Sequence, residues 1–209
     1  MAISNSMTPI QEYANAFTML LPALFLIHSY SRTHPLPSSI SQVVSNGPML
    51  GILATCCHAP VSFIYHIRCA HSMDSSRLHN IWRRLDQSVM HCVIIVFSFV
   101  FSNSLLYTFL VFFPNAWAIS CIFGIHGLQL SHGFPVQAKI LPLVVLYLLP
   151  IVYNGDTRNF LSACFWGFLS FLLFLTSKHI EGWGHAVFHI LTVPYSLALL
   201  RAAIIRAEE

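Results

Sequence analysis

Residues 91–113 read HCVIIVFSFVFSNSLLYTFLVFF and contain no charged side chain. A transmembrane helix needs about 20 consecutive, mostly apolar residues, and this run is longer than that. The short polar group Ser102 to Ser104 divides the run. We therefore interpret it as the end of one membrane helix, near residue 101, and the start of the next, near residue 105.

The composition of the whole chain agrees with this interpretation. Hydrophobic residues make up 56% of the 209 residues and charged residues only 8%, with a mean hydropathy of +0.69. Soluble domains carry about 25% charged residues, so the composition excludes an ordinary soluble domain. The formal net charge is +3 and no long basic run occurs, which argues against a nucleic-acid partner.

Further apolar runs, separated by polar or Pro/Gly-containing segments, follow the same pattern. Each should be helical, because a segment in hydrocarbon must satisfy its own backbone groups, and the short alternating strands of a barrel are not visible. We expect an all-α, polytopic membrane protein with a single seven-transmembrane helix bundle over residues 1–209. The predicted spans are 14–31, 48–67, 85–101, 105–128, 136–153, 160–176 and 183–200. Pro114 and Asn115 predict a kink or a break in the fourth span.

Basic residues give the expected orientation in the membrane. The side that includes the N-terminus carries Arg68, Arg77, Arg83, Arg84, Lys139 and Lys178. The opposite side carries Arg32, Arg158, Arg201 and Arg206. Cytoplasmic loops are enriched in Lys and Arg, so this distribution favours an integral, multi-pass protein with a cytosolic N-terminus. The sequence does not identify the organelle.

The order of the spans brings polar residues together. In a seven-span protein, the end of span two and the starts of spans three and seven lie at one membrane face. Those places hold His66, Asp86, and the pair His185 and His189, while Ser62 lies one helical turn from His66. His185 and His189 are spaced i, i+4, so they share one helical face. Ionisable groups inside a membrane usually face the bundle interior and mark a functional site.

These residues predict a catalytic zinc site. Neutral imidazoles of His66, His185 and His189 with one open position are typical of such a site, and zinc lowers the pKa of a bound water to about 7. Asp86 would accept the proton of that water or orient it. The Ser62 hydroxyl would donate a hydrogen bond to the oxyanion of a substrate carbonyl.

Each residue also has a simpler interpretation. An isolated H-x-x-x-H pair can be coincidental, Ser62 can bond back to the carbonyl of residue 58, and Asp86 can pair with Arg83 or Arg84. We interpret the other histidines within spans as packing or interhelical hydrogen-bonding residues. They are His28, His58, His91 and His126. Two histidines near the same face, His71 and His79, are minor rivals as ligands.

The combination resembles a known group of proteins. Ser62-x-x-x-His66, Asp86 at the start of span three and His185-x-x-x-His189 are similar to the CREST superfamily of transmembrane hydrolases. That superfamily includes alkaline ceramidases, progestin and adipoQ receptors with haemolysin III-like proteins, GPI-anchor remodelling proteins and myomaker-like proteins. The resemblance covers about residues 48–200. It implies a seven-helix bundle with zinc on the three histidines, and Ser62 and Asp86 around a zinc-bound water.

The motifs point to more than one branch of that superfamily. The segment 185–192, HAVFHILT, resembles the ceramidase pattern H-A-x-W-H-I/L-L-T, with Phe188 where Trp is usual. The segments 62–66, SFIYH, and 85–88, LDQS, look more like the receptor and haemolysin III branch or the myomaker-like group. The acidic N-terminal segment associated with calcium in ceramidases has no match, since Glu12 is the only acidic residue before Asp74.

Our leading hypothesis is a zinc-dependent hydrolase that cleaves an amide or ester bond of a membrane lipid, such as ceramide or another acyl lipid. The alternative is a progestin/adipoQ-receptor-like or myomaker-like protein in which zinc is structural. A third hypothesis is haem ligation by paired histidines. The hydrolase hypothesis predicts a metal within about two helical turns of the membrane face that carries Arg77, Arg83 and Arg84. The lipid would arrive sideways between helices.

Overall fold

The computed structural model describes residues 7–71, 81–124, 136–176, 180 and 182–209. Within these ranges the regular elements are α-helices, which confirms the all-α class. They are α1 (Pro9–Ser31), α2 (Ile40–Ser45), α3 (Gly47–His71), α4 (Ile81–Ser102), α5 (Leu105–Ile122), α6 (Val136–Tyr153), α7 (Thr157–Leu175) and α8 (Gly184–Glu208).

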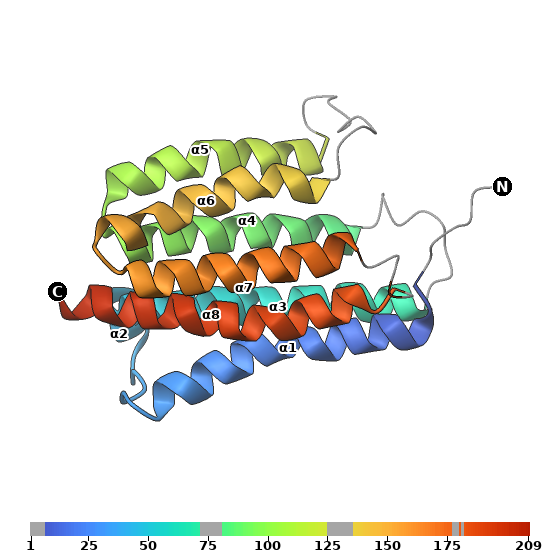
Figure 1. Ribbon diagram of the computed structural model, residues 1–209, viewed down its shortest axis with the longest axis horizontal. Helices are drawn as coiled ribbons and strands as arrows, with labels where there is room; N and C mark the ends of the chain where they lie inside the picture. Colours follow the sequence, from blue (N-terminus) through green and yellow to red (C-terminus); the bar gives the residue numbers. More distant parts are fainter. Residues whose placement is uncertain (1–6, 72–80, 125–135, 177–179, 181) are drawn as a thin grey trace.

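The long helices lie side by side in one bundle, and α2 is a short helix in the connection between α1 and α3 (Figure 1). Helix α1 packs against α3 and α8, α3 packs against α4, and α7 packs against α8. Successive long helices run in opposite directions (Figure 1). The beginnings of α1, α4 and α8 therefore lie at the same end of the bundle as the end of α3.

Six helices are long and apolar enough, by length and composition, to cross a membrane: α1, α3, α4, α5, α7 and α8. Helix α6 contributes a shorter apolar stretch, Pro142–Tyr153, to the described part of the chain. Each of the seven segments expected from the sequence overlaps one of these helices. The six apolar helices support an integral, multi-pass membrane protein.

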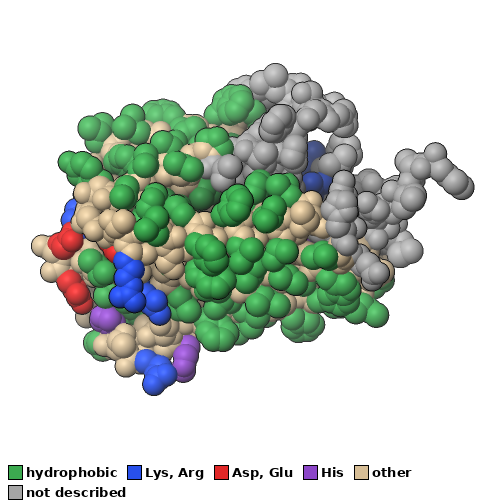
Figure 2. All heavy atoms as spheres, viewed as in Figure 1, with side chains coloured by type: hydrophobic (Ala, Val, Ile, Leu, Met, Phe, Trp, Pro, Cys, Tyr) green, Lys and Arg blue, Asp and Glu red, His purple; other side chains and the backbone are tan. Residues whose placement is uncertain are grey.

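The surface of the bundle is apolar where a membrane would surround it. On α5, Phe109, Leu110, Phe113 and Trp117 are each more than half exposed. Figure 2 shows hydrophobic side chains over the middle of the visible face and charged ones near the end where the chain terminates. Exposed apolar area of this kind is unfavourable in water, whereas lipid chains solvate it well.

The core between the helices is aromatic and closely packed. The rings of Phe97 and Phe101 on α4 pack against Tyr147 on α6, with centroids 6.3 and 6.2 Å apart. Helix α3 approaches α4 closely at Gly51, where an added Cβ would lie 2.8 Å from Phe97 Cε1. Small residues at such contacts allow membrane helices to approach, so Gly51 helps hold α3 and α4 in register.

The first helix begins earlier than expected. Helix α1 starts at Pro9 and not near residue 14, because Thr8 and Gln11 form a capping box. The Gln11 side chain accepts from the Thr8 backbone N–H at 2.8 Å, and the Thr8 hydroxyl accepts from the Gln11 N–H at 3.4 Å. The extra turn places Glu12 inside the helix.

Of the kink or break predicted at Pro114, the break is wrong. Helix α5 continues through Pro114 to Ile122, followed by a turn at Phe123 and Gly124, whereas residues 125–128 of the predicted span lie outside the described ranges. Asn115 donates to the Val111 carbonyl at 2.8 Å and accepts from His91 Nδ1 at 2.7 Å. Membrane helices tolerate proline within a span, and the His91 contact ties this part of α5 to α4.

Candidate metal centre

Three histidines meet at one end of the bundle. His66 comes from α3, and His185 and His189 come from the first turns of α8. Their ring centroids are 4.9 Å apart for His66 and His185, 5.6 Å for His66 and His189, and 4.6 Å for His185 and His189. Each offers one nitrogen, and these three atoms lie within 4.8 Å of one another. This buried cluster could hold a metal ion.

The size of the cluster suits a small ion. An ion at the centre of three atoms 4.8 Å apart would be about 2.8 Å from each, against Zn–N bonds of about 2.0–2.1 Å. Side-chain shifts of less than about 1 Å would therefore complete the coordination. A haem needs its histidines on opposite faces of a wide flat ring, so three converging imidazoles do not fit that cofactor.

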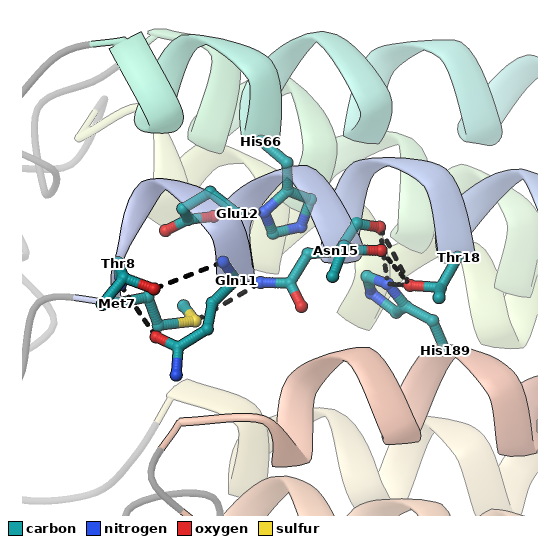
Figure 3. Close-up of polar contacts among 9 residues, drawn as sticks. Met7, Thr8, Gln11, Glu12, Asn15, Thr18, His66 and His189 are labelled. Atoms are coloured by element: carbon teal, nitrogen blue, oxygen red, sulfur yellow. Dashed lines mark hydrogen bonds and ion pairs between the residues drawn. The ribbon is translucent and has the colours of Figure 1, made fainter.

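Helix α1 contacts two of these histidines through the ring nitrogen on the δ side. The Nδ1 of His66 lies 2.8 Å from Glu12 Oε2, and both side chains are buried. The Nδ1 of His189 donates to the Asn15 carbonyl at 3.0 Å and lies 3.2 Å from Thr18 Oγ1. Figure 3 shows Glu12 beside His66, and Asn15 and Thr18 beside His189.

His185 has an aromatic environment. The ring of Phe174 on α7 lies 5.2 Å from the His185 ring, and Phe188 on α8 lies 6.0 Å from it. These rings cover one side of the cluster with apolar surface.

Asp86 lies beside the cluster and is held by α3. Its Oδ1 lies 3.0 Å from His58 Nε2, and the Ser62 side chain is close enough to interact with the carboxylate. Both His66 and His185 are close enough to interact with its charge. Within the described part of the chain, Asp86 pairs with His58 and not with the neighbouring arginines. The Ser62 side chain lies toward Asp86 in this structure.

The site lies near one end of the bundle, as the order of the spans predicted. His66 is five residues from the end of α3, Asp86 is five residues from the start of α4, and His185 is the second residue of α8. With a rise of 1.5 Å per residue, all lie within about 8 Å of their helix ends. Arg83 and Arg84 belong to the same end.

The sequence interpretation missed two functional candidates. Glu12 was placed before the first span, although the Thr8–Gln11 capping box was a signal that the helix begins earlier. His58 was assigned to interhelical bonding, which is confirmed, but its partner is Asp86. The spacing of His58, Ser62 and His66 at i, i+4 and i+8 was the signal that these residues share one face of α3.

Among the residues that the structure describes, the other histidines do not join the cluster. His91 makes an interhelical bond to Asn115, as expected, whereas His28 is exposed and not packed. His71 lies 3.2 Å from the Tyr13 hydroxyl. The other two candidates, His79 and His126, lie outside the described residues.

Comparison with known proteins does not assign this chain to a family. No protein-family model matches it, and no curated protein matches it significantly.

Proposed function

We propose that this chain is a zinc-dependent lipid hydrolase of the CREST type, built as a seven-span bundle. The observation that carries the proposal is the buried group of His66, His185 and His189 with Asp86 beside it. Residues from α3, α4 and α8 meet at this point. The pairing of three imidazoles with a nearby carboxylate is the arrangement that the resemblance implies.

Zinc is the metal that suits these ligands best. Imidazole nitrogens are good ligands for zinc, whereas magnesium and calcium prefer oxygen ligands. Catalytic zinc sites often have three protein ligands. Bound zinc would polarise a carbonyl and make water acidic enough to supply hydroxide near neutral pH. His66, His185 and His189 would hold the ion.

Asp86 would accept a proton from the attacking water. His58 would hold the Asp86 carboxylate in place through the 3.0 Å contact, and the Ser62 hydroxyl would donate to the same carboxylate. We therefore assign Ser62 first to positioning Asp86. Its donation to a substrate oxyanion stays a prediction, because the hydroxyl would have to turn away from Asp86 for that role.

The substrate would be a membrane lipid with an amide or ester bond. The site lies near the end of an apolar bundle, which in a membrane would be close to the depth of lipid carbonyls below the headgroups. Helix α6 would supply the seventh span, since its 18 residues would approximately cross the hydrocarbon region. Phe174 and Phe188 beside His185 offer apolar surface to an acyl chain.

The test is hydrolysis by purified protein reconstituted in phosphatidylcholine vesicles. Vesicles would carry either ceramide or a lysophospholipid, and released fatty acid would be measured before zinc removal, after removal, and after zinc is restored. We expect release that is lost with zinc and returns with it. Stoichiometric zinc without fatty-acid release from either lipid would contradict this proposal and favour the structural-zinc alternative.

A further inference from the structure

Helix α1 provides none of the three histidines, yet it contacts two of them on one face. Glu12 and Asn15 are spaced i, i+3, so they lie on the same side of the helix. The Glu12 carboxylate meets His66 Nδ1 at 2.8 Å, and the Asn15 carbonyl accepts from His189 Nδ1 at 3.0 Å (Figure 3).

These contacts determine which nitrogen of each imidazole is available to a metal. A carbonyl can only accept, and an ionised carboxylate can only accept, so Nδ1 of His66 and of His189 each carries the proton. The lone pair of each ring then lies on Nε2. Hydrogen bonds of this kind fix the tautomer and the ring orientation of metal-binding histidines.

The contact between Glu12 and His66 is almost completely buried. Each residue is only 1% exposed. Positive charge near a buried carboxylate stabilises its ionised form. A dication held by His66 would add such stabilisation through the imidazole that Glu12 contacts.

We propose that Glu12 is a positioning residue of the metal centre. It accepts the His66 Nδ1 proton, directs Nε2 toward the ion and adds negative charge that stabilises a bound dication. This inference rests on the metal site proposed above. It gives α1, which lies outside the region of family resemblance, a role in positioning a ligand of the metal site.

The test compares zinc affinity in Glu12→Gln, Glu12→Ala and Glu12→Asp with wild type, by competition against a chelator of known affinity. Removing the partner of a metal-binding histidine typically weakens metal affinity by about 10–100-fold. We expect the loss of zinc affinity to lie near the upper end of this range for Glu12→Ala. It should lie near the lower end for Glu12→Gln, because glutamine keeps a hydrogen-bond acceptor but loses the charge. Glu12→Asp should recover part of the loss.

The matched control is Tyr13→Phe, one residue from Glu12 on the same helix. It removes the hydroxyl that lies near His71, a histidine outside the cluster, so zinc affinity should stay as in wild type. The visible spectrum of bound Co²⁺ gives a second readout, since a reoriented His66 should alter it in the Glu12 variants and not in Tyr13→Phe.

The outcomes separate this inference from the proposed function. Wild type that binds zinc, with Glu12→Gln and Glu12→Ala equally tight and spectrally unchanged, would overturn the role of Glu12 alone. A wild-type protein without zinc affinity would contradict both the role of Glu12 and the proposed metal site. Should Glu12→Ala fail to fold, the nearly isosteric Glu12→Gln carries the test.

Discussion

At the scale of single residues, the structure separates the histidines that could hold an ion from the carboxylate that we propose would move a proton. Three imidazoles converge with ligand atoms within 4.8 Å of one another, whereas Asp86 contacts His58 and lies near Ser62 beside them. This division predicts that substitutions at Asp86 affect chemistry more than metal content.

Asp86→Asn should retain zinc and lose hydrolysis. Asparagine keeps the shape of the side chain but cannot accept the proton of the attacking water, and a lost general base typically lowers the rate by about 10²–10⁴-fold. Metal content and fatty-acid release would be measured on the same preparation. Loss of zinc in this variant would show that Asp86 is a ligand or a folding element.

His58 should act through Asp86. His58→Phe removes the 3.0 Å contact and should lower turnover while zinc stays bound, because the carboxylate is no longer held. His58→Gln keeps a donor of similar reach and should restore part of the rate. Equal activity in wild type and His58→Phe would exclude this role.

The three histidines could be predicted from sequence because their positions depend on helical spacing and span order alone. The i, i+4 pair on α8 fixes one face, and alternation of direction brings His66 to the same end. Glu12 could not be found in the same way. Its role depends on where α1 begins and on how α1 rotates toward α3 and α8, which is decided by packing.

At the scale of helices, the close contact between α3 and α4 depends on Gly51, which has no side chain. An added Cβ at Gly51 would lie 2.8 Å from Phe97 Cε1, whereas one at Gly47 would lie 3.7 Å from Val100 Cγ1. Phe97 is only 5% exposed and packs against Phe101 and Tyr147, so it has little room to shift.

We therefore expect Gly51→Ala to destabilise the folded protein by about 1–3 kcal/mol, the usual cost of overpacking. Gly47→Ala on the same helix is the matched control and should be nearly neutral, because its contact is of ordinary length. Thermal unfolding in detergent measures both. A larger loss for Gly47→Ala than for Gly51→Ala would contradict the packing described for α3 and α4.

The positions of the helices and several of their ends could be predicted closely, whereas the starts of α1 and α4 and the end of α8 could not. The split at Ser102 to Ser104 is confirmed, since α4 ends at Ser102 and α5 begins at Leu105. Proline suggested a break in α5 because a lone helix would lose a hydrogen bond there. The structure keeps the helix through Pro114, and Asn115 beside it bonds to Val111 and to His91 on the neighbouring helix, a tertiary contact that local sequence does not reveal.

At the scale of the whole molecule, an apolar bundle encloses a small polar site near one end. Six helices are apolar enough to span a membrane, and their exposed surfaces are rich in large hydrophobic residues. Composition alone predicted this class. The placement of the site near the bundle end, with Arg83 and Arg84, follows from the order of the helices.

The central claim is that His66, His185 and His189 bind one zinc ion, and metal analysis of purified protein tests it most directly. The comparison is wild type, His185→Ala, and His28→Ala as a control at an exposed histidine of α1. We predict about one zinc per chain in wild type and in His28→Ala, with X-ray absorption giving Zn–N distances of about 2.0–2.1 Å, and little zinc in His185→Ala. No stoichiometric zinc in wild type, or equal zinc in His185→Ala, would contradict the account.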